Sequence, residues 1–237
     1  MMRLDKYLAE MGVGTRQEVK KQIRQGKAAV NGTVVKAADT KIDETSDEVT
    51  ICGRNISYVS YEYYMLNKPA GVVSATEDRR DTTVIDLIKE KKRKDLFPVG
   101  RLDKDTEGLL LITNDGDLAH RLLAPKKHVD KVYYAKVTGI VTEEDVERFA
   151  QGIDIGTDEE EMTRPAQLDI LKSGEESEIR LTIHEGKFHQ VKRMFQAVKK
   201  EVTYLKRERM GTLCLDEDLN PGEYRLLTEE EIENVRK

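Results

Sequence analysis

The stretch GRLDKDTEGLLLITNDGD, residues 100–117, joins a charged loop, an apolar run and a turn. The run Leu109–Ile112 is apolar at every position, which predicts a strand buried on both faces. Asn114-Asp115-Gly116 then predicts a turn. The charged loop is thereby held at the end of a buried strand, where partial removal from water makes a carboxylate chemically useful.

Two carboxylates of this loop, Asp103 and Asp105, are candidates for chemistry. They share a direction in an extended chain and diverge in a turn, so their spacing does not choose between them. The alternative interpretation is a solvated loop whose acidic side chains only cap a turn.

The segments around this stretch predict an α+β domain with a mostly antiparallel sheet. Strands are expected at 63–66, 109–113, 132–137, 167–171, 179–183 and 204–210. Helices are expected at 83–92, 117–123, 142–151, 189–198 and, after a Thr228/Glu231 capping box, at the C-terminus. The predicted strands and helices do not alternate as repeated βαβ units, and the sequence has no G-x-G-x-x-G or Walker loop. A fold that binds a nucleotide cofactor therefore has no support.

The first 37 residues predict two short helices followed by a hairpin. An apolar stripe at helical spacing precedes a capping box, Thr15 to Glu18, which opens a second helix that ends at Gly26. The pair Asn31-Gly32 is the strongest short signal for a hairpin. A further strand is expected at 48–51, and the polar stretch 53–60 is the expected linker.

Charge is segregated along the chain although the total, 40 Lys and Arg against 45 Asp and Glu, is only −5. Residues 1–37 carry eight basic and three acidic side chains, and residues 187–209 carry eight and two. Acidic residues gather at 39–48, at 158–161 and from 216 onward. A face that binds phosphates needs such segregation. The alternative is that these runs are solvated helix faces.

Composition excludes several classes of protein. The 237 residues are 38% hydrophobic, enough for a core, yet the apolar runs are far too short for a membrane span. The first residues lack an apolar signal region, so we expect a soluble, cytoplasmic protein without a membrane partner. Cys52 and Cys214 lie outside any C-x-x-C pattern and are expected to be buried thiols. The four dispersed histidines argue against a metal site.

The N-terminal helices and Asn-Gly hairpin resemble the S4 RNA-binding domain. Residues 100–117 resemble the second motif of the pseudouridine synthases of the RsuA/RluA superfamily, G/H-R-L-D-x-x-T-x-G-L-L-L-x-T. Residues 64–71 and 185–195 are similar to the first and third motifs, and Lys131-Val132-Tyr133 is similar to the K-x-Y element.

The resemblance implies an S4-like RNA-binding domain at 1–58 and a pseudouridine synthase catalytic domain at 59–237. The second domain should be a mixed, mostly antiparallel sheet flanked by helices. The implied reaction replaces the N1–C1′ bond of uridine with a C5–C1′ bond. Since there is no net redox change or group transfer, no cofactor is required.

The resemblance also implies the catalytic residues. Asp103 is the catalytic carboxylate, Tyr133 stacks on the uracil, and Lys192 is the basic partner. The sequence leaves three roles open to Asp103: attack at C1′, addition to the uracil ring, or abstraction of a sugar proton. On a strand, Tyr133 and Tyr134 point to opposite faces, and the pattern alone does not say which one faces the site.

Further residues are implied to bind the RNA. Arg101 resembles the family arginine that holds the flipped nucleotide, and the other expected substrate-binding residues are Thr106, Gln190 and Arg193. For Lys192 and Arg193, phosphate contact is the alternative role. The basic residues expected to bind RNA in the N-terminal domain are Arg3, Arg16, Lys20, Arg24 and Lys27.

Within the superfamily, the S4 domain and the G-R-L-D form of the second motif are most similar to enzymes that isomerise uridine 516 of small-subunit (16S) rRNA. The expected partner is therefore 16S rRNA, free or in an assembly intermediate, bound by a monomer. One alternative is a non-catalytic S4-domain rRNA-binding or ribosome-assembly protein, against which the intact Asp103, Tyr133 and Lys192 argue. The other is a phosphatase of the haloacid dehalogenase type, suggested by Asp103-Lys104-Asp105, but no βαβ series follows.

Overall fold

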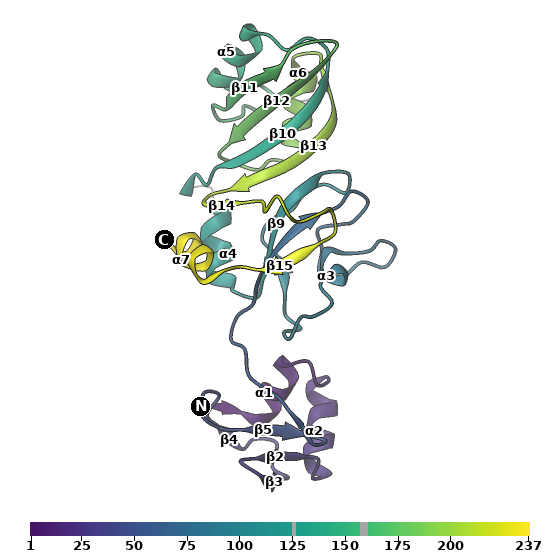
Figure 1. The fold of residues 1–237 in the computed structure, drawn as a ribbon, viewed down its shortest axis with the longest axis vertical. Coiled ribbons are helices and arrows are strands. Elements are labelled where there is room, and N and C mark those ends of the chain that lie inside the picture. The colour runs from purple at the N-terminus through teal and green to yellow at the C-terminus, as the bar shows by residue number, and fades with distance from the viewer. Residues whose placement is uncertain (125–126, 157–160) are drawn as a thin grey trace. The chain divides into compact units, whose positions relative to one another are not determined.

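The computed structural model describes residues 1–124, 127–156 and 161–237, so most of the acidic stretch 158–161 lies outside the described residues. The chain forms two compact units (Figure 1). Unit 1 comprises Met1–Glu62 and Lys89–Leu96, and unit 2 comprises Tyr63–Ile88 and Phe97–Lys237. Among the described helices, none is long and apolar enough to cross a membrane.

Unit 1 contains the two helices and the hairpin that the sequence predicts. Its elements are β1 (Met2–Arg3), α1 (Leu4–Glu10), α2 (Arg16–Arg24), β2 (Ala28–Val30), β3 (Thr33–Val35), β4 (Lys41–Ile42), β5 (Val49–Ile51) and β6 (Arg54–Asn55). Thr15 and Glu18 form the predicted capping box of α2. Asn31 and Gly32 both have positive φ, which suits the tight turn between β2 and β3.

The sheet of unit 1 has the order β3-β2-β5-β6, and β1 pairs separately with β4. The apolar stripe of α1 and the inner face of α2 pack on this sheet, and Leu4, Leu8 and Ile23 have no exposed surface. The expected linker at 53–60 is wrong at its start. Its first residues form β6, because the chain turns at Cys52 and Gly53 and pairs back onto β5.

The expected helix at 83–92 is wrong over most of its length. Helix α3 spans only Val84–Leu87, because Ile88 adopts extended backbone. The following residues belong to unit 1, where the Glu62 carboxylate accepts the backbone N–H groups of Lys92 and Arg93. These bonds satisfy backbone donors that a longer helix would have used internally.

Arg93 anchors this segment in unit 1. Its buried guanidinium donates to the carboxylates of Asp95 and Glu10, to the hydroxyl of Tyr58 and to the carbonyl of Val59. A buried guanidinium is tolerated only when most of its donors are paired, as they are here. Unit 1 is therefore completed by residues that follow the first part of unit 2 in the sequence.

Unit 2 is built on a mixed sheet of nine described strands in the order β11-β12-β10-β13-β9-β7-β15, with β14 and β8 beside β13 and β9. Its elements are β7 (Tyr63–Lys68), α3, β8 (Phe97–Pro98), β9 (Glu107–Thr113), α4 (Gly116–Leu123), β10 (Lys131–Thr138), α5 (Glu143–Gln151), β11 (Gln167–Lys172), β12 (Glu176–Ile183), α6 (Gln190–Ala197), β13 (Glu201–Met210), β14 (Leu213–Cys214), β15 (Tyr224–Leu226) and α7 (Glu229–Arg236). All predicted strands are present, and the α+β class is confirmed.

Antiparallel pairing dominates this sheet, and the junction of β9 with β13 is its parallel step. At that junction Gly108 has a φ of +102° and pairs with Arg207. A Cβ at this position would overlap the backbone of Arg207, so the close approach requires glycine. Strand β9 is buried from Gly108 to Thr113, as its apolar run predicts.

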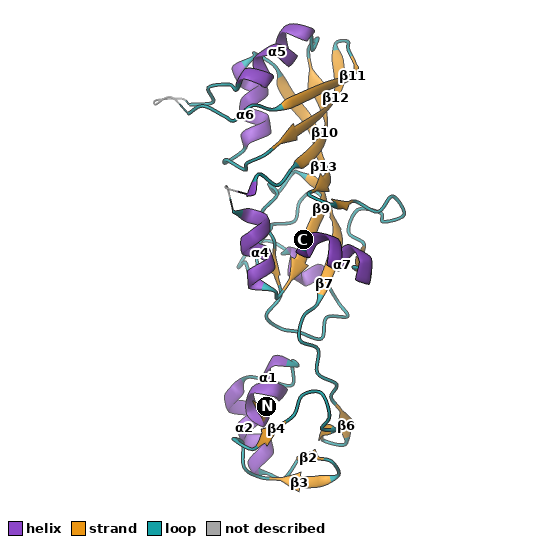
Figure 2. Ribbon diagram, turned by 90° about the vertical axis from the view of Figure 1, so that its left-hand side faces the viewer, coloured by secondary structure: helices purple, strands orange, loops and turns teal. Residues whose placement is uncertain are grey.

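Helices α5 and α6 cover the same face of the sheet beside β11, β12, β10 and β13 (Figure 2). Their contact is made by Phe149 and Phe195, whose ring centroids lie 5.0 Å apart. This packing fixes α6, and therefore the turn that leads into it, against the sheet. Cys52 and Cys214 are both exposed, so the expectation of buried thiols is wrong. Cys52 lies in the turn between β5 and β6, and Cys214 is the last residue of the short strand β14.

Candidate active site

A cavity of about 650 Å³ opens in unit 2. The segments that line it include the loop 100–106 that precedes β9, the strands β10 and β13, and the turn 184–189 with the start of α6. Asp103 lies in the loop, Tyr133 on β10 and Lys192 in α6, and all three line the cavity. The fold thus brings together the three residues for which the sequence predicts a catalytic role.

The loop that carries Asp103 is held on both sides by buried groups. On its N-terminal side, the hydroxyl of Ser74 accepts the N–H of Leu102 at 3.1 Å and donates to the carbonyl of the same residue at 2.8 Å. On its C-terminal side, the N–H of Thr106 donates to the carbonyl of Asp103 at 3.1 Å and closes a turn. The position of the carboxylate is therefore set by backbone bonds on each side.

Lys68 supports the same loop from the end of β7. Its side chain has no exposed surface, and Nζ donates to the carbonyls of Thr106 at 2.8 Å, Pro69 at 3.0 Å and Lys104 at 3.2 Å. Three carbonyls use all three donors of an ammonium group. Burial lowers the pKa of Lys68 from 10.5 to about 8, against the raising effect of nearby carboxylates such as Asp105.

Asp103 lies between the side-chain nitrogens of two residues, Lys192 in α6 and His189 directly before that helix. Nζ of Lys192 lies 3.5 Å from one carboxylate oxygen, and Nε2 of His189 lies 3.5 Å from the other. A neighbouring cation favours the ionised form of a carboxylate that is partly removed from water. The arrangement therefore suits a carboxylate that must act as a nucleophile or base.

Lys192 has a second and shorter contact with Asp105. Its Nζ donates to the two carboxylate oxygens at 2.6 and 2.8 Å, and this hydrogen bond holds the pKa of Asp105 below its usual value. The two carboxylates thus share one ammonium group, and the tighter contact is not with Asp103. Asp105 is the more exposed of the two, and of this pair only Asp103 lines the cavity.

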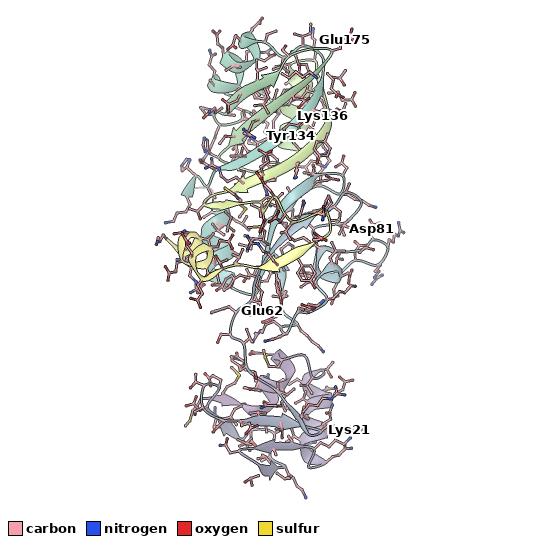
Figure 3. The ribbon with its side chains drawn as sticks, in the orientation of Figure 1. Lys21, Glu62, Asp81, Tyr134, Lys136 and Glu175 are labelled. Atoms are coloured by element: carbon pink, nitrogen blue, oxygen red, sulfur yellow. The ribbon has the colours of Figure 1, made fainter. Side chains whose placement is uncertain are left out.

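Tyr133 and Tyr134 point to opposite faces of β10, and the structure shows which one faces the cavity. Tyr133 is buried and lines it. Tyr134 points to the other face of β10, where its hydroxyl donates to Glu178 at 2.7 Å. Its side chain is labelled in Figure 3. The Glu178 carboxylate raises the pKa of Tyr134 to about 12.

Of the four residues expected to bind substrate, three line the cavity and Arg193 does not. Arg101 is exposed and lines the cavity, and Thr106 lines it with a buried hydroxyl. Gln190 also lines it, but its amide accepts the N–H of Lys187 and donates to Glu185. Its side chain is therefore engaged in shaping the turn.

Arg193 is not among the residues that line the cavity. Its guanidinium donates to the carbonyls of Ile155 and Phe188 and to the carboxylate of Glu161. Arg193 therefore holds the backbone at Ile155 and Phe188 and does not line the cavity. Phosphate contact and direct substrate contact both remain predictions for this residue.

Sequence reasoning missed four residues of the site: Lys68, Ser74, His189 and Arg207. Arg207 is buried, donates from Nε to the carbonyl of Leu109 at 2.8 Å, and lines the cavity. The sequence did hold one signal, because a lysine two residues past the predicted strand 63–66 must find buried partners if the strand continues to it. In the described part of the chain, no group of three or more His, Cys, Asp or Glu is arranged to hold a metal ion.

The basic residues expected to bind RNA in unit 1 are Arg3, Arg16, Lys20, Arg24 and Lys27. The first three surround the carboxylate of Asp5, which has no exposed surface, with N–O distances of 2.9, 3.6 and 3.8 Å. Burial pushes the pKa of Asp5 up, but the cations, led by the hydrogen-bonded Arg3, bring it below its usual value. The other two are exposed. Asp5 thus positions three of these five basic side chains.

A carboxylate between Lys192 and His189 and beside a buried tyrosine, in a chain that also carries a basic helix-and-hairpin unit, fits an enzyme that modifies nucleic acid. Residues 62–197 match the family described as RNA pseudouridylate synthase, and residues 2–49 match the S4 domain. The chain therefore belongs to the RNA pseudouridylate synthase family and is an isomerase with an N-terminal S4 domain.

Relatives and a solved structure agree over the full length. The Bacillus subtilis (strain 168) protein named Uncharacterized RNA pseudouridine synthase YtzG is 49% identical over 98% of this chain and 97% of its own length. Ribosomal small subunit pseudouridine synthase A of Vibrio cholerae is 44% identical over all of both chains. A crystal structure titled pseudouridylate synthase, 39% identical, covers 99% of this chain and all of its own with a TM-score of 0.69.

Replacement of the buried ammonium group should weaken the fold and the site together. In Lys68→Met three carbonyls lose a donor, so we expect the free energy of unfolding to fall by at least about 2 kcal/mol and turnover to fall about tenfold. Urea unfolding and single-turnover rates measure both. Lys172→Met, which alters an exposed lysine of β11 paired with Glu178, is the control and should change neither.

The pH dependence of stability gives a second test of Lys68. Its pKa is about 8 in the folded protein, so between about pH 8 and 10.5 the unfolded chain binds more protons than the folded one. This difference adds stability as the pH rises, and Lys68→Met should lack that component. An identical pH profile for the two proteins would contradict the buried, charged state assigned to Lys68.

Lys192→Met should slow the chemical step about tenfold or more. The change removes the ammonium group that lies 3.5 Å from the Asp103 carboxylate, and it raises the pKa of Asp105, which the hydrogen bond from Lys192 lowers in the wild type. Single-turnover rates at saturating RNA measure the effect. If Lys192 only contacts phosphate, affinity and salt dependence would fall but the rate at saturating RNA would not, as we expect for Arg193→Met.

Proposed function

We propose that this chain isomerises one uridine of small-subunit (16S) ribosomal RNA, uridine 516, with Asp103 as the reacting carboxylate. One observation carries the proposal: Asp103 faces a cavity with Lys192 and His189 at 3.5 Å and Tyr133 in its wall. The name of the Vibrio cholerae relative, ribosomal small subunit pseudouridine synthase A, supports the ribosomal small subunit as the substrate. The proposed enzyme acts as a cytoplasmic monomer on free rRNA or an assembly intermediate.

The cavity can hold a nucleobase only if the uridine leaves its stack. Extrusion costs a few kcal/mol, and stacking of the uracil on Tyr133 offsets part of it at roughly 1 to 3 kcal/mol per base. Arg101, exposed at the same cavity, supplies a cation for the backbone of the extruded nucleotide. The S4 unit adds sequence-independent attraction for phosphates through its basic face.

Within the cavity the N1–C1′ bond breaks, the uracil rotates, and C5 bonds to C1′, while the hydrogen on C5 leaves as a proton and N1 takes up a proton. Asp103 acts either on the sugar or on the ring, and in each case it must be ionised at the start. The Lys192 ammonium group lies 3.5 Å from one oxygen of the carboxylate, and Nε2 of His189 lies 3.5 Å from the other. The bonds made and broken balance without an external oxidant or reductant.

Loss of the C5 hydrogen gives a direct assay. A 16S rRNA transcript tritiated at C5 of uridine should release close to one equivalent of tritium per RNA to water. Transcripts with cytidine in place of uridine 516 should release none. Release from the substituted transcript would contradict the proposed position, and absence of release from free and partly assembled RNA alike would contradict the proposed substrate.

A further inference from the structure

One large apolar side chain stands at the rim of the cavity without cover. Phe188 is 73% exposed, the highest value among the large apolar side chains in the described part of unit 2. It lines the cavity, whereas Ile140 and Leu171, which are also exposed, do not. Scattered exposed apolar residues need no explanation, but an exposed aromatic ring beside a reactive carboxylate does.

The ring of Phe188 is part of a stack. It lies nearly parallel to the imidazole of His189, with 20° between the planes and 3.8 Å between the centroids. One face of the phenyl ring is therefore covered by His189. With most of its surface exposed, the ring still has area for a second flat group.

The backbone under this stack is held in place. Arg193 donates to the carbonyl of Phe188 at 3.2 Å, and Gln190 accepts the N–H of Lys187 at 2.9 Å. His189 adopts a left-handed conformation, with φ of 48°, which is uncommon for a residue other than glycine. Because residues in such conformations persist only where the surroundings determine them, the ring is positioned rather than loose.

The stack is also joined to the reacting group, since Nε2 of His189 lies 3.5 Å from the carboxylate of Asp103. The Asp103 carboxylate, the His189 imidazole and the Phe188 ring thus follow one another, and a flat group stacked on Phe188 would be the next member of this row. The nearby cation Arg101, together with Lys187, which pairs with Glu161 at 3.4 Å, suits a ligand that is both aromatic and anionic. A nucleotide of an RNA strand has both properties.

We propose that Phe188, backed by His189, is a stacking platform for the nucleobase next to the uridine that enters the cavity. The inference rests on the proposed RNA substrate and adds a second base contact to that of Tyr133. The platform receives the neighbouring base at the rim while Tyr133 receives the target inside. Phe188 is thus a positioning residue that helps to keep the strand open.

Binding measurements test this with the full chain carrying Asp103→Asn, which prevents turnover. The probe is a short hairpin RNA containing the target uridine in its loop, with fluorescent 2-aminopurine as the adjacent nucleotide. Phe188→Ala should bind about tenfold more weakly and leave the 2-aminopurine brighter, because stacking quenches it. Phe188→Trp should restore both, and Phe188→Leu, which keeps apolar area but lacks a ring, should not.

Ile140→Ala is the matched control, since Ile140 is exposed on unit 2 away from the cavity. Equal binding by wild type, Phe188→Ala and Phe188→Leu, or unchanged 2-aminopurine fluorescence in Phe188→Ala, would overturn the platform. Tritium release by the protein with Asp103 intact tests the proposed function separately. Tritium release by the protein with Asp103 intact, together with unaltered RNA binding by Phe188→Ala, would therefore contradict the stacking platform and leave the proposed function supported.

Discussion

Asp103→Asn should abolish isomerisation, with a fall in the single-turnover rate of about 1,000-fold or more. The change removes charge and nucleophilicity but hardly any volume, so the loop held by Ser74 and Lys68 should keep its shape. RNA affinity should stay within about threefold of wild type. Rate and affinity measured on the same tritiated RNA would separate the two effects.

Asp105→Asn is the matched control, because it makes the same change two positions away. Asp105 binds Lys192 more tightly than Asp103 does, but it is largely exposed and is not among the cavity-lining residues. We expect a loss of at most about tenfold. If Asp105→Asn were inactive and Asp103→Asn retained substantial turnover, the roles assigned to the two carboxylates would be reversed.

Neutralising the exposed part of the basic face on unit 1 should reduce RNA affinity by orders of magnitude at physiological salt. Replacement of Arg16, Lys20, Arg24 and Lys27 by Gln removes up to four cations that can bind phosphate. The slope of log affinity against log salt should become shallower by about 0.9 for each phosphate group that is no longer neutralised. Titrations at several salt concentrations give the slope directly.

Two comparisons make that result specific. Lys136→Gln with Lys172→Gln neutralises exposed lysines of unit 2 that pair with Glu176 and Glu178, and it should leave the slope unchanged. Since Arg16 and Lys20 also neutralise the buried Asp5, the quadruple variant should be checked for stability by urea unfolding. A folded variant with wild-type affinity and slope would show that this basic face is only a solvated surface.

Local signals in the sequence were enough for most of the fold. The Asn31-Gly32 turn, the capping boxes and the apolar run of β9 each depend on residues within a few positions, and all are present in the structure. The helix expected at 83–92 failed because its second half is fixed by Glu62 and by the partners of Arg93. Those contacts are distant in sequence, so helical periodicity could not reveal them.

The site likewise has residues that could be predicted from the sequence and contacts that only the folded chain determines. The resemblance supplied Asp103, Tyr133 and Lys192, and the structure brings them to one cavity. It did not supply His189 as the second neighbour of Asp103, because that contact depends on a left-handed turn before α6. Nor could spacing show that Lys192 divides its contact between two carboxylates, which only the folded loop determines.

Pseudouridine mapping of ribosomal RNA tests the central claim most directly. RNA from cells with the gene, without it, and with the gene restored as wild type or Asp103→Asn should be compared at every uridine. We predict that one position of small-subunit rRNA, uridine 516, loses its modification without the gene and regains it only with wild type. An unchanged map in the deletion, or full restoration by Asp103→Asn, would contradict the proposed function.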